Sequence, residues 1–109
     1  MVVAKVDQAS AGVISVSGTI DVTNAVAVRV SGERLLAASQ EASIEVDLAS
    51  LEQSGSVAIS VMLCWMRLAK SNGKTLEFTN MPNKMFDVAR VSGLDEVIPL
   101  RAESSVTSL

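Results

Sequence analysis

The spacing of apolar and polar residues predicts four strands and three helices in the order ββαβαβα. Val2, Ala4 and Val6 alternate with polar neighbours, which indicates a short first strand. A turn cluster at 7–12 separates it from a β-branched second strand at 13–18, so the two should form a hairpin. We expect further strands at 43–48 and 75–79. Helices should run from Thr23 or Asn24 to about residue 38, over 57–70, and from a start at 80–82 to an end at Gly93.

Helices that alternate with strands predict an α/β fold, a small and mostly parallel sheet with helices packed on it. The 109 residues suit one domain, which we place at residues 1–100. Val97, Ile98 and Leu100 could add a short edge element, and the polar residues 101–109 should form a flexible tail. Gly32 is unfavourable inside a helix, and we expect it where the helix backbone lies close to the sheet.

The composition narrows the chemistry. The chain has no histidine, which excludes Ser-His-Asp and Cys-His catalysis and His-ligated zinc. The single cysteine, Cys64, cannot form an intrachain disulfide, so a reducing compartment fits the chain. The net charge of −3 argues against nucleic acid as the main partner. We therefore expect a binding module with no catalytic residue, no metal and no cofactor.

No segment is expected to enter a membrane. The longest apolar stretch covers 57–66, about half of the roughly 20 residues that a membrane-spanning helix needs. The first ten residues lack the apolar core of a signal peptide. These features predict a cytoplasmic protein.

The expected helix at 57–70 carries two apolar stripes. One contains Ile59 and its helical neighbours, and the other contains Trp65. The first stripe consists of Ile59, Met62, Leu63 and Met66, and the second of Val57, Val61, Trp65 and Leu68. A helix packed on one sheet needs one stripe. Either both stripes belong to the core, with Trp65 filling the gap between sheet and helix, or the second stripe faces a partner.

The segment from Val46 to Ile59 resembles the signature of the STAS domain family, which includes anti-sigma factor antagonists and domains of sulfate transporters. The family pattern is a strand ending in Asp-Leu-Ser, a short loop, and Asp-Ser-Ser/Ala-Gly-Leu at the start of a helix. Asp47 and Leu48 match the strand end, and Ile59 matches the last Leu. Ser56 falls on the position that is phosphorylated in the antagonists. The family's preceding Asp is Gly55 in this chain.

A second stretch is similar to the STAS-domain subunits of Mla phospholipid ABC transporters. It combines a Leu-x-Trp-Met-Arg helix at 63–67, a Gly-Lys strand start at 73–74 and an Ala-Arg-Val-x-Gly helix end at 89–93. This resemblance implies a ββαβαβα fold and a non-enzymatic subunit that binds the transporter's cytoplasmic ATPase, at the inner face of the inner membrane. The alternative is an anti-sigma factor antagonist that is switched by phosphorylation of Ser56.

The resemblance aligns the first stripe with the core and leaves the second stripe for a partner. The predicted partner-binding residues are Ser54, Gly55, Ser56, Val57, Val61, Trp65 and Leu68. Ser56 is also a candidate helix N-cap, a contact typically worth about 1 kcal/mol. A simpler interpretation of Gly55 is that it only gives the loop freedom in φ. Residues 83–85 could border the same site.

Overall fold

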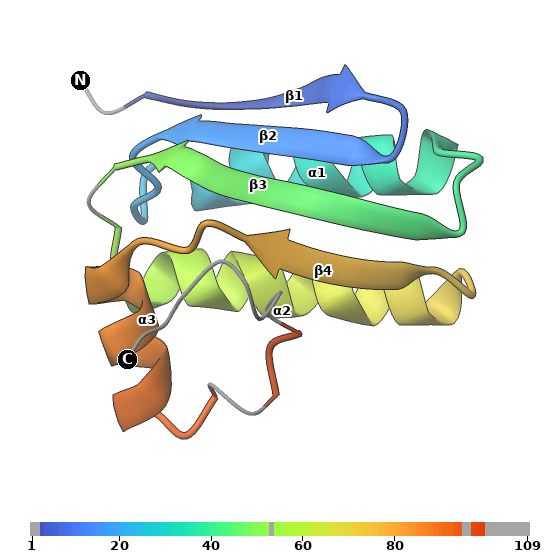
Figure 1. Ribbon diagram of the computed structural model, residues 1–109. Coiled ribbons are helices and arrows are strands. Elements are labelled where there is room, and N and C mark those ends of the chain that lie inside the picture. The colour runs from blue at the N-terminus through green and yellow to red at the C-terminus, as the bar shows by residue number, and fades with distance from the viewer. Residues whose placement is uncertain (1–2, 53, 95–96, 100–109) are drawn as a thin grey trace.

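The computed structural model describes residues 3–52, 54–94 and 97–99. Its elements follow the predicted order ββαβαβα (Figure 1). They are β1 (Ala4–Ser10), β2 (Val13–Gly18), α1 (Ala25–Ala38), β3 (Ser43–Leu51), α2 (Ser56–Ser71), β4 (Thr75–Thr79) and α3 (Asn83–Val91). The α/β fold class is confirmed, and β2 and β4 have the predicted bounds.

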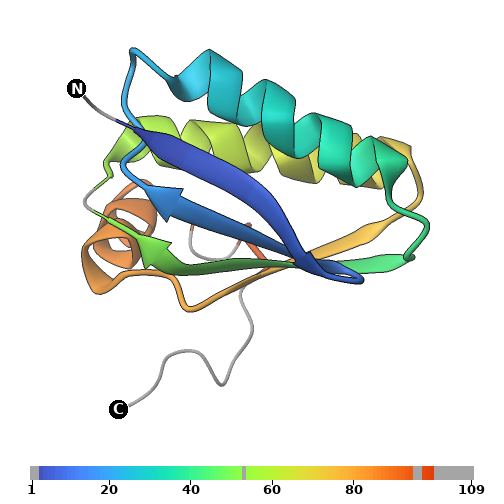
Figure 2. The same cartoon turned by 90° about the horizontal axis from the view of Figure 1, so that it is seen from above.

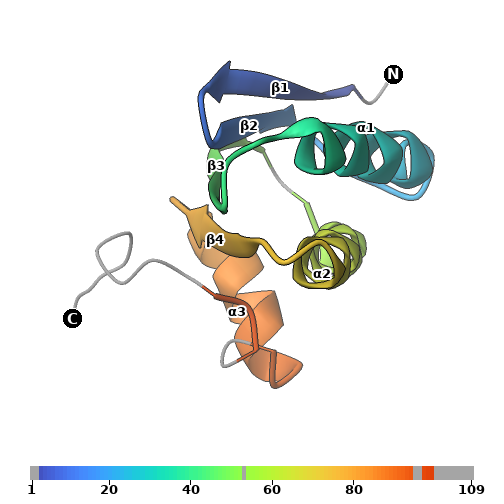
Figure 3. The ribbon, with the colours of Figure 1, turned by 90° about the vertical axis from the view of Figure 1, so that its right-hand side faces the viewer.

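The four strands form one mixed sheet in the order β1-β2-β3-β4. β1 and β2 form the expected antiparallel hairpin, whereas β2 with β3 and β3 with β4 pair in parallel. Figures 2 and 3 show α1 and α2 side by side on one face of the sheet. α3 lies at the end of the molecule where β3 leads into α2 (Figure 1).

Alternation along the strands explains why the helices cover this face. In β2, β3 and β4 every second residue is apolar and buried: Ile14, Val16, Ile44, Val46, Leu48, Leu76 and Phe78. The residues between them are mostly polar and include a row formed by Ser15, Asp47 and Thr79 on neighbouring strands. The buried set forms the core with apolar residues of α1 and α2.

The expected outward orientation of the Trp65 stripe is wrong. Trp65 is 1% exposed and Val61 is 3% exposed, while Val57 and Leu68 are half-buried. The reason is that α2 packs against α1 as well as against the sheet. Trp65 fills the space between the two helices, not the gap between helix and sheet.

Gly32 explains how α1 comes so close. A Cβ atom at this position would overlap the indole of Trp65, so the glycine lets the α1 backbone approach this ring. The sequence correctly marks a close approach at Gly32 but assigns it to the sheet. Within the helix at 25–38, Val28, Gly32 and Leu36 are buried.

Two strands are longer than their patterns predict. β1 continues to Ser10, into the expected turn cluster. β3 continues to Leu51 because the end of β2 offers it a partner, with Ser17 opposite Ser50 and Gly18 opposite Leu51.

The expected edge element near Val97 is only partly described. Ile98 is buried, and the Pro99 carbonyl accepts a hydrogen bond from the Phe78 N–H of β4 at 2.9 Å. Leu100 and the predicted tail at 101–109 lie outside the described residues. None of the helices within the described ranges is both long enough and apolar enough to cross a lipid bilayer.

Candidate functional site

An open groove of about 800 Å³ lies where the β2–α1 loop, the β3–α2 loop and α3 meet. We call it the loop groove. Each of its three walls comes from one of these segments. The lining residues are Thr19, Ile20, Asp21, Val22, Ser54, Gly55, Ser56, Val57, Lys84 and Val88. Parallel pairing of β2 with β3 brings the two loops together, because both strands end at the same edge of the sheet.

Hydrogen bonds fasten the two loops to each other and to themselves. The Ser54 hydroxyl accepts from the Ile20 N–H at 3.1 Å and donates to the Glu52 carbonyl at 3.0 Å. Asn24 accepts from the Asp21 N–H at 2.9 Å and donates to the Thr19 carbonyl at 2.9 Å. These bonds hold the loops in one arrangement, so the groove is formed before any partner arrives.

Ser56 does not cap α2. Gly55 is the N-cap residue, Ser56 is the first helical residue, and the cap makes no side-chain hydrogen bond. The Ala58 N–H instead donates to the Gly55 carbonyl at 3.1 Å. The Ser56 side chain is exposed and has no hydrogen-bond partner among the described residues. Its hydroxyl is therefore available at the groove surface.

The backbone conformation at Gly55 does not require a glycine. Its φ is −102°, which any residue can adopt, and a Cβ atom there would meet no atom of the described residues within 4 Å. The expectation that Gly55 supplies freedom in φ is therefore unsupported by the geometry. The loop has room for a larger residue at the position where the family pattern has Asp.

The groove carries charge on two of its walls. Hydrogen bonds from the Thr23 hydroxyl, and from the backbone near it, stabilise the Asp21 carboxylate and lower its pKa below the ordinary value. Lys84, at the start of α3, supplies a positive charge to the same groove. Asp21 thus stays ionised under mildly acidic conditions, so both signs of charge are present.

Two smaller hollows continue from the loop groove along the surface between α1 and α2. The first, of about 190 Å³, is lined by Ala25, Val26, Arg29, Val57, Ser60, Val61 and Cys64. The second, of about 430 Å³, is lined by Arg29, Glu33, Cys64, Arg67, Leu68 and Ser71. They share Arg29 and Cys64, and together we call them the interhelical groove. Val57 belongs to both this groove and the loop groove.

The structure distributes the predicted partner-binding residues over these surfaces. The four residues Ser54, Gly55, Ser56 and Val57 come together in the loop groove. Val61 lies at the base of the interhelical groove, and Leu68 lines its far end. Trp65 lines none of these hollows and is buried beneath them.

Sequence reasoning missed the apolar residues that α1 and its preceding loop contribute. Val22 is 81% exposed and lines the loop groove, and Val26 is 66% exposed and lines the interhelical groove. The available signal was a pair of valines, with Val22 just before the expected helix and Val26 outside its buried side. Lys84, one of the residues expected to border the site, does line the loop groove.

Comparison with known families identifies the fold. Residues 3–101 match the family model described as "Mlab, STAS domain". The chain belongs to the STAS domain family.

Solved structures share the fold of this STAS domain. The anti-sigma factor antagonist SpoIIAA in its unphosphorylated form is 14% identical, with a TM-score of 0.69 over 93% of this chain and 90% of that chain. An anti-sigma factor antagonist from Mycobacterium paratuberculosis is 25% identical, with a TM-score of 0.66 over 92% and 85%. A STAS domain protein from Planctomyces limnophilus, described as an anti-sigma-factor antagonist, is 18% identical, with a TM-score of 0.65 over 89% and 87%. None of the curated proteins matches this STAS domain significantly.

Proposed function

We propose that this STAS domain is a non-enzymatic subunit of an Mla-type phospholipid ABC transporter. It binds the cytoplasmic ATPase at the inner face of the inner membrane and supports the assembly or activity of the complex that maintains outer-membrane lipid asymmetry. Membership in the family described as "Mlab, STAS domain" supports this proposal. The preformed loop groove supplies the docking surface.

One observation carries the docking role, namely the exposed valine at the edge of the loop groove. Val22 is 81% exposed beside a hollow that also contains Val57 and Val88. An apolar side chain in water next to an open hollow favours burial by a partner, because removing apolar surface from water is favourable. The hydrogen-bonded loops keep this surface in place.

The test compares two exposed valines. Val22→Glu should abolish capture of the purified ATPase–permease complex, because it places a charge in the apolar contact. Val91→Glu is the matched control: Val91 is 87% exposed on α3 and lines no part of the loop groove. Both variants should keep the wild-type melting temperature. Equal capture by the two variants would rule out docking through the loop groove, and failure of the wild-type chain to bind would reject the transporter role.

The second candidate is an anti-sigma factor antagonist, regulated by phosphorylation of Ser56. The exposed Ser56 hydroxyl and the three antagonists with the same fold support it. A phosphate on Ser56 would meet the N-terminus of α2 favourably. Gly55, in place of the family's Asp, favours the transporter role instead.

Two measurements separate the candidates. Copurification from the native host should bring down an ABC ATPase with a permease, whereas an antagonist would bring down an anti-sigma kinase. Mass spectrometry of the same material should find Ser56 unmodified, and stoichiometric phosphate there would favour the antagonist. Gly55→Asp sharpens the comparison because the loop has room for the side chain. It should leave ATPase capture unchanged if the acidic residue serves only the phosphorylated antagonists.

A further inference from the structure

The interhelical groove is a continuous surface with an apolar base. Val61 and Cys64 lie between its two ends, Val26 stands exposed at one end, and Leu68 lines the other. On α2 the groove extends from Val57 to Ser71, which corresponds to roughly 20 Å of helix. This length matches about four turns of a partner helix.

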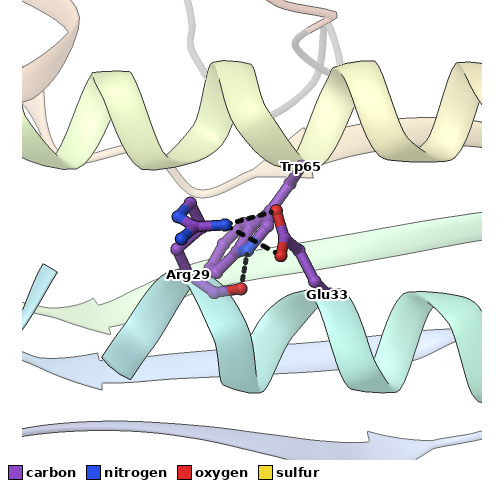
Figure 4. A network of polar contacts seen from close by, with 3 residues as sticks. All are labelled: Arg29, Glu33 and Trp65. Atoms are coloured by element: carbon purple, nitrogen blue, oxygen red, sulfur yellow. Dashed lines mark hydrogen bonds and ion pairs between the residues drawn. The ribbon is translucent and has the colours of Figure 1, made fainter. Parts of the chain in front are cut away.

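The rim of the groove is positively charged. Arg29 and Arg67 stand on its two sides, one on α1 and one on α2, and Glu33 is the only acidic residue among the described ones that lines it. Arg29 pairs with Glu33 at 3.0 Å, as Figure 4 shows. Arg67 is exposed and has no ion-pair partner among the residues that the structure describes. The groove therefore offers an unpaired cation beside an apolar base.

The two helices that form the groove also carry a net positive charge. The cations are Arg29, Arg34, Arg67 and Lys70, and Glu33 is the only carboxylate, so α1 and α2 together have a charge of +3. The whole chain has a net charge of −3. The positive charge is thus concentrated on the helical layer, and an anionic partner would be attracted to this layer specifically.

We propose that the interhelical groove binds an acidic amphipathic helix of the ATPase subunit. This inference rests on the proposed function, because Val57 joins the interhelical groove to the loop groove and makes the two a continuous docking surface. The apolar side of the partner helix covers Val26 and Leu68 above the buried Val61, and an acidic residue beside it pairs with Arg67. Helix-in-groove docking of this kind uses apolar anchors one helical turn apart.

The shape favours a helix over an anionic bilayer. A bilayer surface binds apolar side chains that project outward together with basic residues. Here the apolar residues Val61 and Leu68 lie in the hollows between the helices, and Val61 is 3% exposed. A partner helix can enter the groove and contact this concave base, whereas a flat bilayer surface cannot reach it.

The experiment uses the full chain and the purified ATPase subunit. Arg67→Glu should weaken binding about tenfold at low ionic strength and less at high ionic strength, because screening reduces the interaction. Arg34→Glu is the matched control, since Arg34 is exposed on α1 and does not line the groove. It should change the affinity less than about twofold.

Cys64 supplies an independent measurement in the wild-type chain. Its thiol is half-buried, lines both hollows and is the only thiol of the chain. Alkylation of Cys64 by a maleimide should be lost when the ATPase subunit is bound. This readout needs no substitution, so it does not depend on the stability of a variant.

The outcomes separate the two proposals. If the complex forms while Cys64 stays reactive and Arg67→Glu binds normally, the inference is overturned and the transporter role stands. If the wild-type chain binds no ATPase, both are overturned. Vesicles containing phosphatidylglycerol form a third arm. If Arg67→Glu lowers vesicle binding and leaves the ATPase affinity unchanged, the groove serves a membrane and the helix proposal is wrong.

Discussion

Trp65 determines how the two long helices fit together. Its Nε1–H donates to the Arg29 carbonyl of α1 at 3.0 Å (Figure 4). Its ring occupies the space that Gly32 leaves free. The sequence shows the indole and the glycine, but the two are 33 positions apart. The residues around either position do not indicate that Trp65 and Gly32 are in contact. The two stripes of α2 were therefore predictable from periodicity, whereas the partner of each stripe was not.

Replacing Gly32 by alanine tests this contact. The added methyl group overlaps the Trp65 ring, and overpacking of this kind costs about 1–3 kcal/mol, against a gain in helix propensity of about 1 kcal/mol. We expect a net loss of up to about 2 kcal/mol in the free energy of urea unfolding, with a red-shifted Trp65 emission. Ser31→Ala lies at an exposed position of the same helix and is the control. It should keep the wild-type free energy of unfolding and the wild-type Trp65 emission. A Gly32→Ala variant that is more stable than wild type would contradict the contact.

At the scale of the element, α2 is apolar on most of its surface because it packs against the sheet, α1 and α3. Ala58, Ile59, Val61, Met62, Trp65 and Ala69 are all buried. Because α2 packs against so many elements, little of its apolar surface is left for a partner. The candidate surface on this helix is therefore narrower than the sequence indicated, and it consists of residues such as Ser56 and Val57 at the helix start and Leu68 near its end.

Two adjacent residues on α2 should differ strongly in how much a substitution by glutamate destabilises the fold. Val61→Glu buries an unpaired carboxylate in the core and should destabilise the fold by at least about 3 kcal/mol. Ser60→Glu, at the exposed neighbouring position, should change the free energy of unfolding by less than about 0.5 kcal/mol. Thermal unfolding followed by circular dichroism measures both. If the Val61→Glu variant had the wild-type melting temperature, Val61 and its stripe would face outward and the core assignment would be wrong.

At the scale of the whole molecule, the candidate site depends on topology more than on any one segment. Parallel pairing of β2 and β3 brings Asp21 and Ser54 to one edge, and α3 adds Lys84 from a distant part of the sequence. The signature around Ser56 could be recognised from the sequence alone. The contributions of Val22 and Val26 could not, because their exposure follows from where α1 sits on the sheet. Recognition of the family thus located the loop, and the packing of the helices defined the surface around it.

The packing also predicts that the described chain unfolds as one unit. β3 lies between β2 and β4, α2 contacts both other helices, and Met85 and Ala89 join α3 to the core. Trp65, the only tryptophan, reports the α1–α2 contact by fluorescence, whereas far-ultraviolet circular dichroism reports all elements. Their urea transitions should coincide, as expected for a single domain of this size. If the circular dichroism signal fell before the Trp65 fluorescence changed, α3 or the β1–β2 hairpin would unfold separately from the core. The loop groove, which needs α3 as a wall, would then exist only when α3 is docked.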